Sequence, residues 1–234
     1  MHYFPIEPLL LLVFASAIVA LAILVPLGLL SYVYERLGLR PGQALLALTA
    51  TLLGGYVNIP LFRLPGRRVI VEQSISFFGA RHVLPAVSDW PGTIVAINVG
   101  GAVIPIALSF YLVTRRRIFV PAALATAIVA AFCNHVSVLV PGAGIEMPVL
   151  APPVVAAIVA CLISWREAAA LAYVGGNLGA LIGADVLNLG NIRALGAPIA
   201  SIGGAGTFDG VFLTGVLAVL LASLAGGPTR AVAK

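Results

Sequence analysis

Two carboxylates, Asp185 and Asp209, stand at the edges of otherwise apolar, glycine-rich segments of the chain. The connection between them consists mostly of small and apolar residues, and Arg193 is its only charged residue. Two carboxylates within about 3–4 Å of each other share one proton, because both cannot ionise cheaply. One can then activate a water molecule while the other donates to a carbonyl oxygen. The pair therefore predicts an aspartic hydrolase that needs no metal and no cofactor.

The elements that must position this pair are predicted to be membrane spans. Hydrophobic residues make up 61% of the chain and charged residues 9%, whereas soluble domains carry about 25% charged residues. We therefore expect an all-α, polytopic transmembrane bundle that forms a single integral domain over residues 1–234. The net charge of +5 comes from Lys and Arg between apolar runs. Basic residues there orient spans in the lipid bilayer, so no nucleic-acid partner is expected.

Seven apolar runs have about the length of 20 residues that a membrane-spanning helix needs. They cover approximately residues 8–32, 41–61, 91–113, 118–140, 149–165, 168–189 and 208–224. The one long polar connection, Arg63–Trp90, contains RVIVEQSISFFG, whose loose apolar–polar alternation is typical of a half-exposed strand. This connection is predicted to be partly extended and to lie over the outer ends of the helices.

The basic residues predict the orientation of the spans. Of the 13 Lys and Arg, five fall on one side of the predicted bundle, and the remaining eight on the other. The five are Arg63, Arg67, Arg68, Arg81 and Arg193, and the eight are Arg36, Arg40, Arg115, Arg116, Arg117, Arg166, Arg230 and Lys234. Because the cytoplasmic side carries the excess of basic residues, we expect a plasma-membrane protein with its N-terminus outside and its C-terminus in the cytoplasm.

The same layout brings the two aspartates to one membrane depth. Asp185 lies near the end of the sixth predicted span and Asp209 near the start of the seventh, with a connection that folds back between them. Glycines at 175, 176, 179 and 183 recur in steps that predict one smooth helix face for close packing. We expect the seventh span to be the neighbour on that face.

Other polar and glycine residues on the same side are candidates for supporting roles. The glycine-rich run from Ser201 includes Gly203, Gly204 and Gly206, whose backbone can approach an extended peptide substrate. Asn188, His135 and Glu146 are expected to support the site. No spacing typical of a metal site accompanies these residues, so a metal-free dyad is favoured. Asp209 can alternatively cap the seventh helix, because a carboxylate offsets the dipole of a helix N-terminus.

The segments GADVLNL and GAPIASIGGAGTFDG resemble a family of bacterial and archaeal multi-pass membrane proteins known only as a domain of unknown function. This resemblance extends over nearly the full length of the chain. At the level of motifs, Gly183-Ala184-Asp185 resembles the Gly-x-Gly-Asp of intramembrane aspartyl proteases of the presenilin, signal peptide peptidase and prepilin peptidase type. Ala184 stands where that motif has its second glycine.

Two further segments carry the protease resemblance. Phe208-Asp209 resembles the Tyr-Asp motif of these proteases with Phe for Tyr, and its order relative to the Gly-Asp motif is the reverse of presenilin. The segment PVLAP at 148–152 resembles their Pro-Ala-Leu segment, which borders the substrate strand. The resemblance implies that Asp185 and Asp209 are catalytic, and that Gly183, Pro148 and Leu150 contact a membrane-embedded peptide.

Two other functional interpretations remain open from the sequence. Helices broken by Gly and Pro, with acidic residues at membrane depth, are also typical of an ion-coupled transporter or a channel subunit. A non-catalytic membrane scaffold, in which the aspartates only cap or pair, is the third. The identity of the substrate and the oligomeric state stay undetermined.

Overall fold

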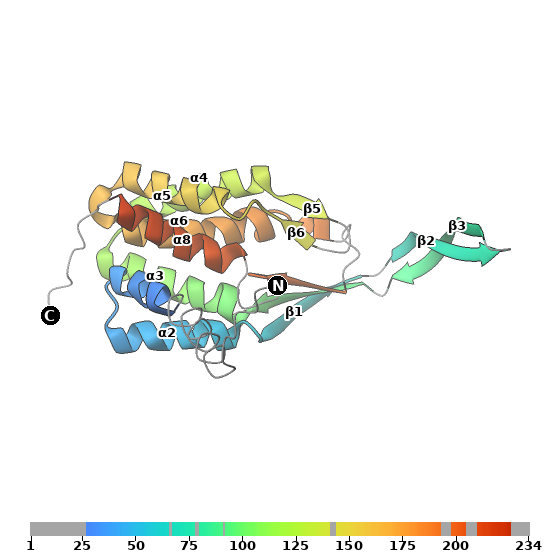
Figure 1. The fold of residues 1–234 in the computed structure, drawn as a ribbon, viewed down its shortest axis with the longest axis horizontal. Coiled ribbons are helices and arrows are strands. Elements are labelled where there is room, and N and C mark those ends of the chain that lie inside the picture. Colours follow the sequence, from blue (N-terminus) through green and yellow to red (C-terminus); the bar gives the residue numbers. More distant parts are fainter. Residues whose placement is uncertain are drawn as a thin grey trace, which may run out of the picture.

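The computed structural model describes residues 27–65, 67–77, 80–90, 92–140, 144–192, 198–204 and 210–225. A helix bundle occupies one end, a small sheet joins its other end, and a two-stranded ribbon extends beyond the sheet (Figure 1). Residues 27–36 are helical. They are followed by α2 (Pro41–Gly54), α3 (Ile104–Arg116), α4 (Phe119–Val136), α5 (Ala151–Ile163), α6 (Ala168–Ala180) and α8 (Gly210–Leu224).

The α6 helix forms the centre of the bundle. It packs against α3, α4, α5 and α8, and most of its side chains are buried. A short 3-10 turn, η2 (Trp165–Glu167), precedes α6, while a π-helical segment, η3 (Leu181–Val186), and a 3-10 turn, η4 (Leu189–Asn191), follow it. A second π-helical segment, η1 (Val99–Val103), leads into α3.

Within the described part of the chain, two helices are long and apolar enough to cross a membrane. They are α4 and the continuous helical run from Trp165 to Asn191. The apolar helices α2, α5 and α8 are shorter. The described part of the chain is therefore mostly helical, as predicted, and its two long apolar helices do not confirm the seven spans expected. The first predicted span lies largely outside the described residues.

A three-stranded sheet replaces parts of two predicted spans. Its order is β1 (Asn58–Leu64), β4 (Thr93–Asn98), β7 (Ile199–Ile202), with β1 antiparallel and β7 parallel to β4. The segment from Thr93 to Ile97 is β-branched at every position except Ala96, which favours a strand. Pro60 lies on the edge strand beside a register shift, where a missing N–H group is tolerated. The prediction of an all-α bundle, with helices over 41–61 and 91–113, is wrong in these segments. A short apolar run does not by its sequence distinguish a strand from a helix.

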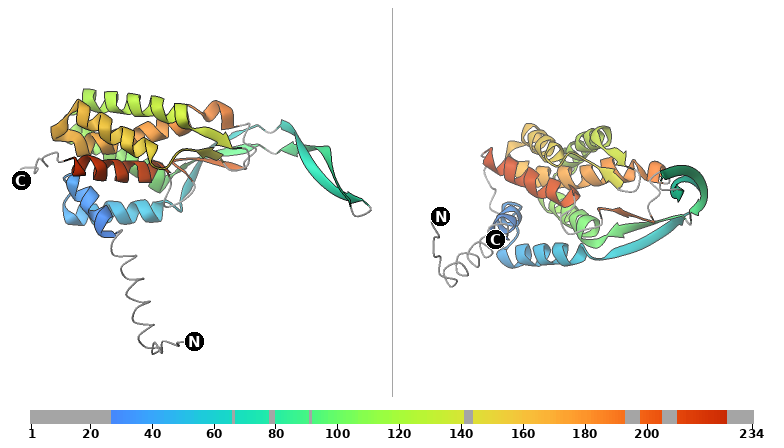
Figure 2. Two further views of the ribbon diagram at one scale, coloured as in Figure 1. Left: turned by 45° about the horizontal axis from the view of Figure 1, so that its top comes forward. Right: turned by 45° about the vertical axis from the view of Figure 1, so that its right-hand side comes forward.

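The long connection between α2 and α3 is extended, as predicted. Its strands β2 (Arg67–Phe77) and β3 (Ala80–Trp90) pair antiparallel along their full length. The ribbon extends away from the helices in Figure 1 and in the left view of Figure 2, so the expectation that it lies over the helix ends is wrong. Full pairing satisfies the inner backbone groups within the ribbon itself. A second small hairpin, β5 (Val138–Val140) with β6 (Gly144–Glu146), ends the fourth predicted span early.

The glycines of α6 and η3 do form a close-packing face, but their neighbour is α4. An added Cβ at Gly175 would lie 3.1 Å from Ala125 Cβ, and one at Gly179 would lie 2.6 Å from Val129 Cβ. Gly176, one residue further round the helix, faces the Thr214 carbonyl of α8 instead. The predicted close packing is therefore confirmed for Gly175, Gly179 and Gly183. The prediction of one face for all four glycines is wrong, because Gly176 lies on the face that packs against α8, the predicted seventh span.

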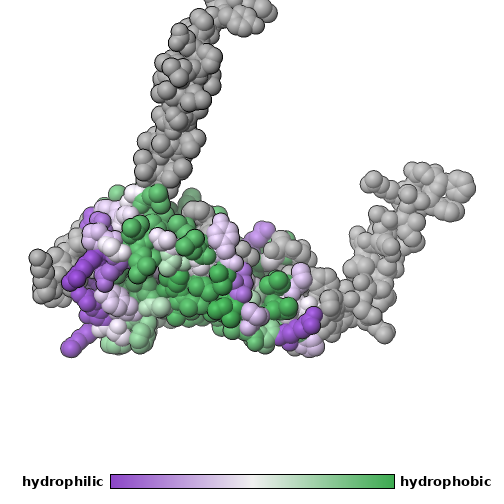
Figure 3. Space-filling view, turned by 90° about the horizontal axis from the view of Figure 1, so that it is seen from below, coloured by the Kyte–Doolittle hydropathy of each residue, from purple (hydrophilic) through white to green (hydrophobic). Residues whose placement is uncertain are grey.

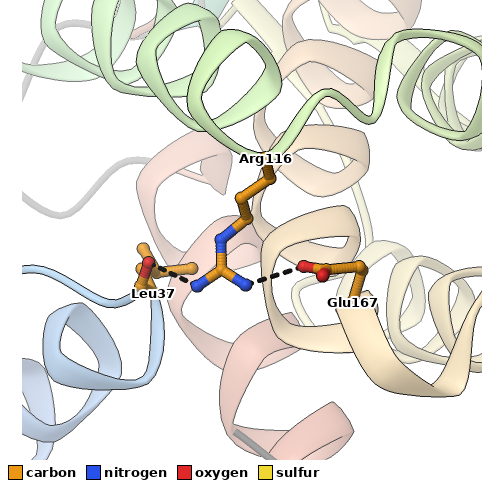
Figure 4. A network of polar contacts seen from close by, with 3 residues as sticks. All are labelled: Leu37, Arg116 and Glu167. Atoms are coloured by element: carbon orange, nitrogen blue, oxygen red, sulfur yellow. Dashed lines mark hydrogen bonds and ion pairs between the residues drawn. The ribbon is translucent and has the colours of Figure 1, made fainter. Parts of the chain in front are cut away.

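An ion pair joins three chain segments at the basic end of the bundle. The Arg116 guanidinium donates from Nη1 to Glu167 Oε2 at 2.7 Å and from Nη2 to the Leu37 carbonyl at 2.8 Å (Figure 4). The Arg116 and Glu167 side chains are only 11% and 14% exposed. These contacts hold the end of α3 to the start of α6 and to the turn before α2.

Candidate functional site at the junction of sheet and helices

Asp185 lies within η3, where the continuous helix leaves α-helical geometry. π-helical turns occur frequently at functional sites, because the extra residue redirects side chains. The Asp185 side chain is half-buried. Its Oδ2 accepts a hydrogen bond from the backbone N–H of Gly203 at 2.7 Å. The structure thus brings together two of the predicted site residues that are 18 positions apart in the chain.

The conformation of Gly203 makes this hydrogen bond possible. Its φ is +82°, in the left-handed region that favours glycine. An added Cβ would lie 2.7 Å from Ala102 N and from the Gly101 carbonyl carbon. The turn after β7 therefore requires a residue without a side chain at 203, and it directs the N–H of that residue towards Asp185.

The hydrogen-bond ladder of the sheet defines which side of β7 Asp185 occupies. The Ile94 N–H donates to the Pro198 carbonyl at 2.9 Å, so residues 198, 200 and 202 bond to β4 and their neighbours face outwards. The N–H groups of residues 199, 201 and 203 therefore point to the outer edge. Among the described residues, no strand pairs with that edge. Asp185 accepts a hydrogen bond from the last of these outward N–H groups, that of Gly203.

Asn98 joins the strands to the helix ends. Its Nδ2 donates to the Gly55 carbonyl at 2.8 Å and to Asn58 Oδ1 at 3.1 Å, while its Oδ1 accepts from Gly101 N–H at 2.7 Å. The side chain is fully buried, at 0% exposure. The Ser201 hydroxyl donates to the same Asn58 oxygen at 2.6 Å. The predicted substrate residue Ser201 thus uses its side chain to tie β7 to β1, and sequence reasoning did not assign Asn58 and Asn98 to the site.

Asn188 supports the end of the π-helical segment. Its Nδ2 donates to the Ala184 carbonyl at 2.9 Å, to the Gly183 carbonyl at 3.3 Å and to the Ser137 hydroxyl at 3.2 Å. Asn188 therefore fixes the turn that carries Asp185 against the start of the β5–β6 hairpin. Gly183 itself lies in the α4 seam, where an added Cβ would be 2.8 Å from Cys133 Cβ.

The other predicted site residues within the described ranges are mostly exposed. His135 lies in the last turn of α4 and Glu146 ends β6, and both are exposed. Pro148 and Leu150 are exposed in the segment that enters α5. No group of three His, Cys, Asp or Glu side chains that could hold a metal ion occurs in the described ranges. Gly204 follows Gly203 in the same left-handed turn.

Asp209 and Gly206 lie outside the described residues. Gly210, which follows Asp209 directly, is the first residue of α8, and α8 packs against α6. The chain therefore leads from the Gly203 turn beside Asp185 through Asp209 into a helix that neighbours the one carrying Asp185.

Together these features define an apolar helix-bundle protein with a three-stranded sheet at one end and the Asp185 carboxylate where the two meet. Residues 52–221 match the model of a family described as "Protein of unknown function (DUF1614)". The chain belongs to this family, which agrees with the predicted membership of an uncharacterised family. No curated protein and no solved structure gives a significant match. The matched range includes both Asp185 and Asp209.

Proposed function

We propose that this chain is a multi-pass plasma-membrane protein in which Asp185 and Asp209 form an aspartyl hydrolase site for extended or membrane-embedded peptides. The exposed apolar side chains of its outer helices are the evidence for membrane insertion. Leu46 of α2, Val120 of α4 and Leu162 of α5 are 70%, 78% and 81% exposed. An apolar band crosses the bundle between polar ends in the space-filling view (Figure 3). Exposed apolar surface of this kind marks contact with lipid or with another apolar surface.

The observation that carries the hydrolase proposal is the hydrogen bond from Gly203 N–H to the Asp185 carboxylate. It attaches the carboxylate to the outer edge of β7. An extended peptide can add to a sheet edge through backbone hydrogen bonds. Such a peptide, bound to the outward N–H groups of residues 199 and 201, would run directly towards Asp185.

The proposed chemistry needs only the two carboxyl groups and water. The ionised carboxylate takes a proton from water, and the water oxygen attacks the carbonyl carbon of the peptide. The protonated carboxyl donates its proton to the carbonyl oxygen. Collapse of the tetrahedral diol breaks the C–N bond while a proton passes to the leaving nitrogen. The backbone N–H of Gly203 keeps the Asp185 carboxylate in a fixed orientation throughout.

Substitution of each aspartate by asparagine tests this proposal. The reconstituted protein is incubated with a synthetic transmembrane peptide that carries an extended flank, and the products are identified by mass spectrometry. Asp185→Asn and Asp209→Asn should each abolish cleavage, and the double variant should be no worse than either. Glu35→Gln removes an exposed carboxylate that precedes α2 and should cleave normally. Cleavage at the wild-type rate by either Asn variant would overturn the hydrolase proposal.

An ion-coupled carrier is the second candidate, because buried polar side chains lie inside the bundle. Asn177 of α6 is 1% exposed and packs against Gly215 of α8, and Thr51 and Thr214 are also buried. A carrier would show ion-dependent uptake into vesicles and can retain transport with one aspartate replaced. A scaffold would tolerate asparagine at both positions in every assay.

A further inference from the structure

Two outer helices are short for a membrane span. α2 has 14 residues and α5 has 13, and the two lie on opposite sides of the bundle (Figures 1 and 2). At about 1.5 Å per residue each is about 20 Å long, whereas the hydrocarbon core of a bilayer is about 30 Å thick. Both helices expose large apolar side chains along their length, including Leu46 and Ile158.

Basic residues determine where the bilayer begins at one end of these helices. Arg40 directly precedes α2, Arg116 lies in the last turn of α3, and Arg166 follows α5 after two residues. Charged side chains are costly in hydrocarbon. One edge of the hydrocarbon core therefore coincides with this end of the bundle. The core cannot shift along the helices, so the whole difference between the helix length and the core thickness falls at the other end.

At the other end, the backbone leaves helical geometry where the short helices stop. α2 ends at Gly54 and is followed by the exposed edge strand β1. The segment that enters α5 contains exposed Val149 and Leu150. Lipid-exposed irregular backbone and open sheet edges do not occur within the hydrocarbon core, because their polar groups would lack partners. The second edge of the core therefore lies near Gly55 and near Leu150.

We infer that the protein thins the bilayer to about 20 Å beside α2 and α5. α4, with 18 residues and about 27 Å, requires less thinning. Asp185 lies 17 residues beyond Ala168, the first residue of α6, which is about 26 Å at 1.5 Å per residue. In an undistorted core of about 30 Å this carboxylate would lie inside hydrocarbon. Thinning brings it and the edge of β7 to the aqueous boundary, where water for hydrolysis is available. This inference rests on the proposed membrane insertion.

Thiol accessibility tests the position of the boundary. Cys133 and Cys161 are replaced by Ala, and single cysteines are introduced by Val57→Cys and Val149→Cys beyond the short helices. Leu46→Cys and Ile158→Cys within them are the matched controls. The vesicles are made of eighteen-carbon phosphatidylcholine. The cysteines at 57 and 149 should react with a charged, water-soluble maleimide at least about tenfold faster than those at 46 and 158, because hydrocarbon excludes charged reagents.

The outcomes separate the inference from the membrane proposal. Slow reaction at all four positions would place the boundary beyond Val57 and Val149 and overturn the thinning. Fast reaction at all four would show that the bundle is not inserted, which overturns the membrane proposal itself. A second measurement needs no variant: the thermal midpoint of the unmodified protein should be highest in fourteen-carbon lipid and lowest in twenty-two-carbon lipid. The reverse order would also overturn the thinning.

Discussion

Substitution of Gly179 by alanine should destabilise the bundle through the seam between α6 and α4. The new Cβ would lie 2.6 Å from Val129 Cβ, whereas carbon atoms in contact are normally about 3.5–4.0 Å apart. The two helices must therefore separate by about 1 Å along the seam. Overpacking of this kind costs about 1–3 kcal/mol.

Gly176→Ala is the matched control, because it lies in the same helix and makes ordinary contacts of 3.4–3.5 Å. Both substitutions gain about 1 kcal/mol of helix propensity, so the difference between the two variants isolates the packing term. Unfolding in detergent, followed by circular dichroism, should show Gly179→Ala to be less stable than Gly176→Ala by about 1–3 kcal/mol. Equal stabilities would refute the close approach of α4 and α6.

Three further predictions concern other parts of the chain. Arg116→Gln should lower the free energy of unfolding, measured by denaturant titration, by about 1–2 kcal/mol. It removes two charge-assisted hydrogen bonds, and water still partly screens the ion pair. Arg117→Gln is the control and should change the free energy of unfolding by less than about 0.5 kcal/mol. Asn98→Ala should cost about 3 kcal/mol or more, since it leaves the Gly55 carbonyl and the Gly101 N–H unpaired, and an unchanged thermal midpoint would contradict this. Reporter fusions after Arg117 and after Arg193 should report the cytoplasm and the outside respectively, and equal readouts would contradict the proposed topology.

Local patterns in the sequence predicted the parts of the fold that depend on them. The glycine steps from Gly175 to Gly183 predicted a close-packed face, because helix geometry alone aligns residues four apart. The alternation within RVIVEQSISFFG predicted an extended segment for the same reason. The helix that packs against this face was not predicted, because the sequence of α6 alone does not indicate where α4 lies.

The sheet was missed because its pairing is non-local. The apolar run that contains Thr93–Asn98 is compatible with a buried helix or a buried strand, and its partner β7 lies about 100 residues later in the chain. The site was predicted only in part. Asp185 and the glycine-rich run that contains Gly203 were predicted, but the π-helical geometry of η3, the turn at Gly203 and the roles of Asn58 and Asn98 depend on the sheet itself.

The central claim is that Asp185 and Asp209 lie close enough to act as one unit. A disulfide tests this distance directly, because it forms only when the two Cα atoms are about 4.4–6.8 Å apart. Asp185→Cys and Asp209→Cys are combined in the chain with Cys133→Ala and Cys161→Ala, oxidised in the membrane and analysed by peptide mass spectrometry. The proposal predicts an intramolecular cross-link between the two introduced cysteines. Separate alkylation of both thiols, with no cross-linked peptide after oxidation or after treatment with a short bifunctional thiol reagent, would contradict the shared-proton mechanism.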